Sequence, residues 1–459
     1  MAVAFAAAAA VLVIIVRRSR PGPPRGAVLL GRRLVDRGVR VVTGPNTFHR
    51  FFDSSPFSPS GRYLVATRTA RGGPRDVAPL EAGAVVVYDL VAGGRAPVYE
   101  RATRAWDAQL GAQAQWGATD DVLYLNDVAA VGPPLVVRGV EVRAWSSAAP
   151  REVALDAPIY HVSRDGRYAV SPLDLAALRL TQPGYGVVAP SDQIEALRRA
   201  RRRAPAPADD GVVVTDLATR TSRVVATIAD LVDRAGLRDR PRPVADPRPG
   251  GRRPSRRCGF HAFHVKLRDD GGRIMVVLRE RGACARGPGA APGNANHVLT
   301  MDRGGGGGVR VVATWLARGS HPNWLPDGRV SMNFGGKICA FADAENATCA
   351  VLSRRASGHP AAAPRGGVLV ADTYAKEGPR FGLPGGASLL RRVLPKPERD
   401  LGIFHAPGAG VWRCDLHPAF DRTGERVAIN IVVDGARRVA VLNVTERLRA
   451  QGTDEGGVT

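Results

Sequence analysis

The sequence predicts an all-β protein, a seven-bladed β-propeller whose blades are four-stranded antiparallel sheets. Three observations predict this fold. A Pro-x-Gly or Asp-Gly turn, preceded by an apolar or aromatic residue and followed by an alternating strand, recurs seven times along the chain. The copies are spaced by roughly 40–60 residues, which is the period of a propeller blade, except for a longer interval between the third and fourth copies that carries insertions. Strands of a second kind, ending in Asp or a polar turn, lie between the copies.

The repeated turn phrases account for most of the chain in order. Turn residues between runs of period-2 alternation are typical of β-hairpins. The phrases lie at 57–68, 117–127, 162–172, 267–278, 325–334, 363–373 and 421–431. The intervening strands lie at 84–94, 211–225, 297–312 and 438–444. Two stacked β-sandwiches are the alternative, but near-even spacing and a single repeated phrase favour a ring. We expect the ring to close by pairing segments from the two chain ends in one blade.

The remaining segments are expected to lie outside the blades. We assign the propeller to residues 41–447, with loop insertions at about 175–210 and 235–257. The first insertion carries a charged helical piece, DQIEALRRARRRAP, whereas the second is too rich in Pro and Arg to pack. An Arg/Pro/Gly-rich linker is expected at 19–40, and a disordered tail at 448–459.

The N-terminal segment resembles a targeting signal. Residues Ala2–Val16 are uniformly apolar and are followed by Arg17 and Arg18. The run is shorter than the ~20 residues of a spanning helix and closer to a signal-peptide core, although it lacks a preceding basic residue and a clean cleavage site. We predict that residues 1–18 form a signal peptide or a short membrane anchor. The protein is then secreted or held in the endomembrane system or at the cell surface, with membrane contact only through this segment.

The net charge of +23 arises from 65 basic residues, of which only four are Lys. A GC-rich genome that encodes Arg freely explains this composition in one way. A basic surface that concentrates anionic ligands, such as a uronate polysaccharide, a nucleic acid or a phospholipid face, explains it in another. We expect no nucleic-acid partner. The absence of a G-x-S-x-G elbow, a P-loop and a dinucleotide fingerprint argues against hydrolase and nucleotide-binding classes.

Five cysteines are an odd number, so at least one of them stays outside any internal disulfide. Cys339 and Cys349 flank a predicted hairpin and are able to pair. Cys414 is expected to be free or bound to a metal.

Residues of metal-ligand types precede the last three turn phrases. His321, His359 and His417 each stand just before Pro, and Asp415 and Cys414 lie beside the last of them. Because the innermost strand of every blade runs along the central channel, residues just before these strands gather around the axis. A mixed set of N, O and S ligands suits Zn or Mn better than Ca. The alternative for each His-Pro is a hydrogen-bonded residue at a strand start.

Longer phrases resemble a known family. HRFFDSSPFSPSGRYLVATR, AWDAQLGAQAQWGATDDVLYLND, SRDGRYAVSP with RLTQPGYG, GHP with ADTY, and RCDLHPAFDRTGERV are similar to secreted bacterial propellers related to oligogalacturonate lyases and propeller-type ulvan lyases. The similarity extends from about Asn46 to Val444. It implies a seven-bladed propeller, a metal held by His and neighbouring ligands, and β-elimination on a glycan that contains uronic acid.

The resemblance also implies particular ligands. In oligogalacturonate lyases, His residues and one Gln hold the cation. One of these His follows Ser or Thr before a strand, as His321 does here, and two form a close pair where this chain has Asp415-x-His417. The Asp departs from the pair of His, and the Gln has no obvious counterpart.

Eliminative cleavage of a uronate requires neutralisation of the carboxylate, a base for the adjacent C–H and an acid for the leaving oxygen. GFHAFHVKL lies where the related lyases place their catalytic His. Residues three apart in a strand face opposite sides, so we favour His264 as the base and keep His261 as the second choice. Arg179 is expected to bind a carboxylate and Tyr185 to act as acid or base. His49 is a further candidate, and each of these residues also has a plain packing role as its alternative.

Two functions remain open. The first is a polysaccharide lyase that cleaves a uronate-containing anionic polysaccharide or oligosaccharide with a divalent metal ion. The second is a non-catalytic propeller that binds an anionic glycan or a protein partner in the same funnel. The two differ in whether Tyr185, Arg179, His264 and the metal ligands converge. We expect a monomer in either case.

Overall fold

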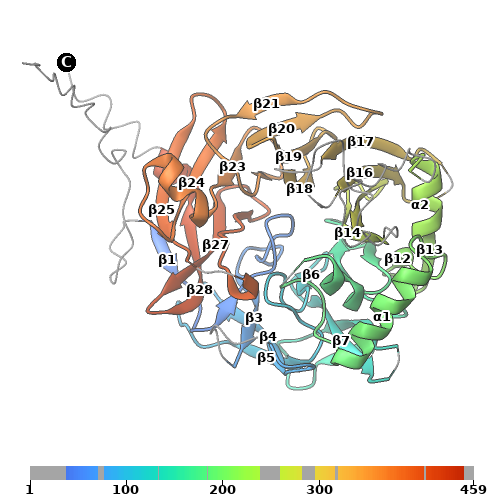
Figure 1. The fold of residues 1–459 in the computed structure, drawn as a ribbon. Coiled ribbons are helices and arrows are strands. Elements are labelled where there is room, and N and C mark those ends of the chain that lie inside the picture. Colours follow the sequence, from blue (N-terminus) through green and yellow to red (C-terminus); the bar gives the residue numbers. More distant parts are fainter. Residues whose placement is uncertain are drawn as a thin grey trace, which may run out of the picture.

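Seven four-stranded antiparallel sheets surround a central axis in the computed structural model (Figure 1). The structure describes residues 38–448 except 71–76, 133, 183, 238–258, 282–294, 306, 316–318 and 408–409. The predicted fold class, a seven-bladed propeller of four-stranded blades, is confirmed. The predicted N-terminal signal or anchor, almost all of the linker and second insertion, and nearly all of the tail lie outside the described residues.

The first four blades each use consecutive strands, counted outward from the axis. Blade 1 contains β2 (Thr47–Phe48), β3 (Tyr63–Thr69), β4 (Gly83–Asp89) and β5 (Tyr99–Thr103). Blade 2 contains β6 (Gln115–Trp116), β7 (Val122–Ala130), β8 (Val136–Arg143) and β9 (Arg151–Ala154). Blade 3 contains β10 (His161–Val162), β11 (Tyr168–Pro172), β12 (Gly211–Asp216) and β13 (Ser222–Thr227). Blade 4 contains β14 (Gly259–Leu267), β15 (Arg273–Arg281), β16 (Ala295–Asp302) and β17 (Arg310–Trp315).

The last three blades continue this order, and the seventh also contains the first strand of the chain. Blade 5 contains β18 (Gly319–Trp324), β19 (Val330–Phe334), β20 (Lys337–Phe341) and β21 (Ala350–Ser353). Blade 6 contains β22 (Ala361–Ala362), β23 (Leu369–Asp372), β24 (Ala387–Leu394) and β25 (Arg399–His405). Blade 7 contains β26 (Ala419–Phe420), β27 (Arg426–Val433), β28 (Ala436–Asn443) and β1 (Val39–Val41).

The repeated turn phrase joins the two inner strands of a blade, and its glycine explains why it repeats. In blade 3, the Gly166 N–H donates to the carbonyl of Ser163 at 2.9 Å, and Gly166 has a φ of 68°. Blade 4 repeats this bond from Gly271 to Arg268 at 2.8 Å, with a φ of 67°. Positive φ is accessible to glycine at little cost, so the turn selects this residue in blade after blade.

The strands bury both faces because each blade packs between two others. All seven residues of β4 are buried. Val85 and Val87 belong to one apolar cluster with Leu123 and Leu125 of the next blade. A strand covered on both faces loses the strict alternation that a half-exposed strand shows. The core is therefore made of apolar clusters between neighbouring blades, such as those that join blade 1 to blade 2 and blade 7 to blade 1.

Two segments depart from the blade pattern. The connection from β11 to β12 contains the 3₁₀ helix η1 (Ala176–Leu180) and the helix α1 (Ser191–Arg203), so the helical piece expected in the first insertion is present (Figure 1). After β13 the chain forms α2 (Ile228–Arg234), which the sequence analysis did not predict. A capping box starts it, in which Thr227 accepts from the N–H of Asp230 and the Asp230 carboxylate accepts from that of Thr227.

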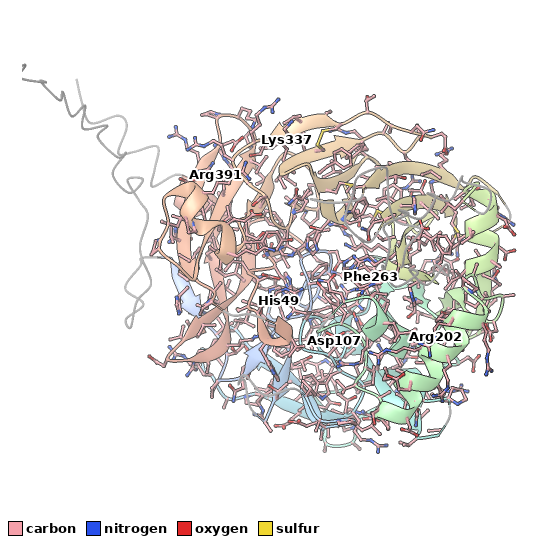
Figure 2. All side chains as sticks on the ribbon, in the orientation of Figure 1. His49, Asp107, Arg202, Phe263, Lys337 and Arg391 are labelled. Atoms are coloured by element: carbon pink, nitrogen blue, oxygen red, sulfur yellow. A yellow bond between two sulfur atoms is a disulfide. The ribbon has the colours of Figure 1, made fainter. Side chains whose placement is uncertain are left out.

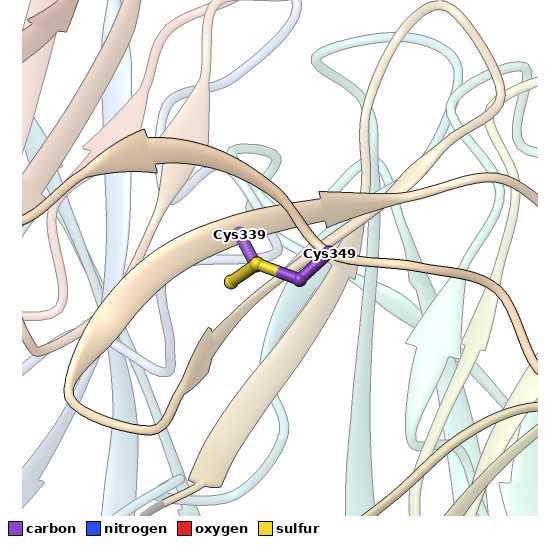
Figure 3. Close-up of a disulfide and its surroundings, with 2 residues drawn as sticks. All are labelled: Cys339 and Cys349. Atoms are coloured by element: carbon purple, nitrogen blue, oxygen red, sulfur yellow. A yellow bond between two sulfur atoms is a disulfide. The ribbon is translucent and has the colours of Figure 1, made fainter.

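The expected disulfide joins Cys339 of β20 to Cys349, next to the outer strand β21 (Figure 3). It fastens the edge of blade 5 across a separation of 10 residues. Cys414 is free and buried, as one of its two predicted states required. Within the described residues, no helix has the length and apolar character needed to cross a bilayer.

The ring closes through the pairing of β1 with β28, where Val39 lies opposite Leu442 and Val41 opposite Ala440. This confirms the expected closure by the two chain ends. The strand begins at Val39, two residues before the predicted start of the propeller, because the linker composition continues up to the strand itself.

We predict that a chain beginning at Gly38 keeps the full thermal stability of the ring and that a chain beginning at Thr43 does not. The shorter chain lacks β1 and leaves β28 as an unpaired edge. The expected result in a thermal melt is a clearly lower melting temperature and more aggregation for the shorter chain alone. Equal melting temperatures would show that the β1–β28 pairing contributes nothing.

Candidate metal centre and the cavity beside it

Four residues within or just before inner strands adopt an unusual backbone. Gln113, His264, His321 and His417 have φ values of 57°, 51°, 59° and 47°. Each stands two residues before a paired inner-strand residue of its blade, and β14 and β18 show a register shift at this point. Left-handed backbone costs a non-glycine residue about 1–2 kcal/mol. Strain of this kind is concentrated at functional sites, where the surrounding fold holds it in place.

The histidines that stand two residues before a paired inner-strand residue in blades 4 to 7 form a cluster on the axis. This histidine cluster is defined here as His264, His321, His359 and His417, of which His359 alone lacks the left-handed backbone. The ring centroids of His321 and His359 are 4.1 Å apart, and those of His359 and His417 are 4.5 Å apart. All four rings lie within 5.5 Å of the Phe51 ring, which is fully buried. The three His-Pro histidines therefore do converge.

Phe51 belongs to a segment that fills the centre of the ring, near His49, which Figure 2 labels. Lys266, whose Nζ lies 5.3 Å from the centre of the Phe51 ring, forms an ion pair of 2.8 Å with Asp53, and both side chains are fully buried. Arg50 pairs with the same carboxylate group. The aromatic and ionic layers separate the histidine cluster from a smaller cavity of about 120 Å³ at the other mouth of the channel, which Asp53 and Phe52 line.

His359 is held in one orientation by a buried carboxylate. Its Nδ1 lies 3.0 Å from both oxygens of Asp372, whose Oδ1 also accepts from the His359 backbone N–H at 2.5 Å. Nε2 is buried and has no hydrogen-bond partner among the described residues. A carboxylate behind a histidine is the usual arrangement for a metal ligand, because it fixes the tautomer that leaves the other nitrogen free.

Gly358 makes room for this carboxylate. A Cβ at position 358 would lie 1.9 Å from Oδ1 of Asp372. The glycine of the GHP phrase thus permits the contact that orients the next residue.

His359, Asp415 and His417 form a group that fits a metal ion. One ligand atom from each lies within 4.8 Å of the others. Ligand atoms that share an ion at about 2.2 Å are at most about 4.4 Å apart, so a slight closing suffices. Both ring nitrogens of His417 are buried without a hydrogen-bond partner in the described part of the chain. A buried nitrogen without a hydrogen-bond partner destabilises the folded protein unless a bound ligand interacts with it.

Two predicted ligands lie beside this group rather than in it. His321 contacts His359 but falls outside the set of three. Cys414 is buried and lines the neighbouring cavity, but its thiol is also outside the set. Burial raises the pKa of Cys414 to about 12, which disfavours the thiolate that binds metals.

A cavity of about 1000 Å³ opens beside the cluster, and His264, His321 and Asp415 form part of its wall. Tyr374 also lines it, with its hydroxyl 3.2 Å from Ser320 Oγ. Four basic side chains complete the wall: Arg279, Lys376, Arg380 and Arg413. Asp415 accepts from Arg413 Nε at 3.0 Å. Two carboxylates, of Glu377 and Asp415, also line the cavity. Neutral histidines and four cations against two carboxylates suit an anionic ligand.

His264 is fixed between two aromatic residues. Its Nδ1 lies 2.7 Å from the Tyr160 hydroxyl, and its ring stacks on Phe51. Burial, with the charges of Lys266 and Arg279, holds the pKa of His264 well below its usual value. Burial and the neighbouring histidines do the same for the pKa values of His321 and His417. These imidazoles are therefore neutral at physiological pH.

The other predicted catalytic residues lie around this cavity rather than on its wall. Tyr185 is fully buried, and the guanidinium that donates to its hydroxyl, at 3.3 Å, belongs to Arg413. Arg179 is not among the residues that line the cavity, and its charge acts on Asp107. His49 and His261 are buried and line no part of the cavity.

Four residues of the region escaped the sequence analysis as site candidates. Phe51, Tyr374, Arg279 and Gln113 belong respectively to the phrases HRFFDSSP, ADTY, VLRER and AQAQWG. Gln113 occupies in blade 2 the position that the histidines occupy in blades 4 to 7, and its Oε1 accepts from Arg50 at 2.6 Å. Each of these histidines lies seven residues before the turn glycine of its phrase, and Gln113 lies seven residues before Asp120. Aligning the phrases with Asp120 in the glycine position would have revealed Gln113.

Solved structures share this fold. An oligogalacturonate lyase in complex with manganese matches with a TM-score of 0.53 and 13% identity, over 88% of this chain and 92% of that one. The oligogalacturonate lyase of Vibrio parahaemolyticus matches with a TM-score of 0.54 and 12% identity, over 88% and 93%. The propeller domain of the Trilobed protease from Pyrococcus furiosus is more distant, at 0.38 and 9%, over 71% and 78%.

No protein-family model and no curated protein matches the chain. The structural likeness shows that the protein has the seven-bladed fold of the oligogalacturonate lyases.

We predict that Gly358→Ala weakens manganese binding. The added Cβ displaces the Asp372 carboxylate and frees the His359 ring, and loss of such a supporting contact costs 10–100-fold in affinity (roughly). Calorimetric titration with Mn²⁺ measures the affinity of the variant and of the wild type. Gly385→Ala is the matched control in the same blade, because a Cβ there meets nothing within 4 Å. Equal affinities of the two variants would contradict the role of Asp372.

We predict that the metal-free protein loses stability on acidification from pH 7 to 5. Burial lowers the pKa of His49 and His261 to about 3 and that of His161 to about 4. Below pH 6.5 these histidines bind protons in the unfolded chain but not in the folded one. Acidification to pH 5 therefore lowers the free energy of unfolding by about 2 kcal/mol for each of the three histidines. Asp107 and Asp210 act in the opposite direction, because burial raises their pKa values to about 6. Each raises the free energy of unfolding by about 1 kcal/mol over the same pH change.

The net effect is a loss of at least about 3 kcal/mol, which urea unfolding at the two pH values measures. Unchanged stability at pH 5 would mean that the histidines are accessible to water.

Proposed function

We propose that the protein is a metal-dependent polysaccharide lyase that cleaves an anionic, uronate-containing glycan by β-elimination. The observation that carries the proposal is that Asp415, of the His359–Asp415–His417 group, and His264 line one cavity whose wall is rich in Arg and Lys. The fold shared with oligogalacturonate lyases, one of them solved with manganese, supports it.

A divalent cation would be held by His359, Asp415 and His417, with His321 within reach of the same ion after a small ring movement. Nitrogen and carboxylate donors suit Mn or Zn. Bound there, the ion would neutralise a uronate carboxylate and so acidify the adjacent C–H.

His264 is the proposed base. In the tautomer in which its Nδ1–H donates to Tyr160, Nε2 carries the lone pair that accepts a proton. Its lowered pKa keeps the imidazole unprotonated at neutral pH. The stacked Phe51 ring and the Tyr160 hydroxyl hold the imidazole in place, which favours a fixed distance to the substrate.

Tyr374 is the proposed acid for the leaving oxygen. Its hydroxyl lies on the cavity wall, and burial together with the Asp415 charge raises its pKa well above 10, so it stays protonated. Tyr185, the earlier candidate, stays behind Arg413 and is the second choice. Arg413 itself faces both Asp415 and the cavity, where it is able to bind a substrate carboxylate.

The Cys339–Cys349 disulfide supports export, because disulfides persist in oxidising compartments. A non-catalytic glycan-binding propeller would use the same cations. The buried His264–Tyr160 pair favours the enzyme, because a binding site has no need of an oriented neutral imidazole.

Two variants separate the metal from the base. We predict that His417→Ala loses bound manganese and activity, whereas His264→Ala keeps the metal and loses about 10²–10⁴-fold in rate. The assay follows the ultraviolet absorbance of unsaturated uronate ends on polygalacturonate and ulvan, with metal content measured on the same samples. His405→Ala, an exposed histidine of β25, is the control. A wild-type protein that binds manganese but produces no unsaturated ends from any uronate polymer would favour the binding module.

A further inference from the structure

Arg279 is a buried cation with only neutral partners. Its side chain belongs to β15, and the residue is 8% exposed. Nε donates to Asn296 Oδ1 at 2.7 Å, and Nη1 donates to Gln182 Oε1 at 3.0 Å. The guanidinium carbon lies 4.1 Å from the centre of the Phe263 ring. No described residue accepts a hydrogen bond from Nη2, and the residue lines the 1000 Å³ cavity.

Arg273, on the same strand, shows how this protein otherwise buries an arginine. It is also 8% exposed, but it is paired with Asp302 and Asp343 at 2.6 Å each. Arg437 is buried without a carboxylate as well, yet its donors hold the carbonyls of Ala108 and Arg413 together and it does not line the cavity. Hydrogen bonds to backbone carbonyls explain why Arg437 is buried without a carboxylate. Arg279 makes no such bonds to the described backbone, so its burial needs another explanation.

Further positive charge surrounds Arg279. Burial and the charge of Arg281 lower the pKa of Arg279 to about 10. The charges of Arg201, Arg281 and Arg279 all act on His261 nearby. Residues two apart in a strand share a face, so Arg281 lies on the same side of β15. A desolvated cation next to like charges is costly, and an anion in the cavity would relieve that cost.

We propose that Arg279 forms an oxoanion subsite of the cavity, in which Nη2 and the adjoining guanidinium edge hold a carboxylate or sulfate group. Asn296, Gln182 and Phe263 fix the guanidinium plane, so the free edge is oriented before the anion arrives. The proposal rests on the proposed function only for its natural occupant, the carboxylate of a second uronate beside the one at the metal.

The test measures binding in the presence of a chelator, so that neither metal nor catalysis is required. Calorimetry with sodium sulfate is run on the wild type, Arg279→Met and Arg273→Met. We expect the sulfate affinity of Arg279→Met to fall on the order of tenfold or more, as for loss of a charge-assisted hydrogen bond. Arg273→Met, whose site is already neutralised, should keep the wild-type affinity. Unchanged sulfate affinity in Arg279→Met overturns the proposal.

Stability provides an independent readout. Without an anion, Arg279→Met should melt at or above the wild-type temperature, because it removes an uncompensated charge, whereas Arg273→Met should melt lower. A drop in Arg279→Met as large as in Arg273→Met would assign Arg279 to the framework and overturn the proposal.

Comparing the binding of digalacturonate with that of its methyl ester identifies the source of the oxoanion. Tighter binding of the acid than of the ester, lost in Arg279→Met, supports a uronate carboxylate. Sulfate binding that depends on Arg279, with no such preference for the acid, supports an inorganic oxoanion at the same subsite. Absence of manganese or of lyase activity would refute the proposed function and leave this result standing.

Discussion

The left-handed backbone at the start of the inner strands is the constraint on which the rest of the site depends. It turns His264, His321 and His417 toward the axis, each from a different blade. Isolated residues would not keep this conformation, which costs about 1–2 kcal/mol each. The ring keeps it because every inner strand is hydrogen-bonded outward, and closure by β1 leaves no blade free to relax. The fold thereby supplies the free energy that holds these histidines in place.

Phe51 and the ion pair beneath it give these histidines their chemistry. The phenyl ring lies within 5.5 Å of four imidazoles, and the ammonium of the buried Lys266–Asp53 pair is 5.3 Å from its centre. Burial among these groups keeps His264 neutral. A neutral imidazole binds a metal or accepts a proton without first losing one. The burial that packs the centre of the ring therefore also sets the protonation state of these histidines.

The architecture was predictable because one turn recurs, and a glycine at positive φ marks that turn in every blade except the second, which has Asp120 in its place. The convergence of His321, His359 and His417 was predictable from that periodicity, since equivalent positions meet at the axis. Arg279 was not predictable: its importance lies in having Asn296 and Gln182 instead of a carboxylate, and tertiary packing alone sets those partners.

Local sequence also misled where contacts are long-range. RLTQPGYG places Arg179 near Tyr185 along the chain, but the partner of the hydroxyl, Arg413, comes from 228 residues away.

The most direct measurement of the central claim is anomalous scattering at the manganese edge from crystals soaked in Mn²⁺. The account predicts one strong peak bonded to His359 Nε2, Asp415 and His417. A well-ordered crystal with no peak there, or with manganese bound elsewhere, would contradict it.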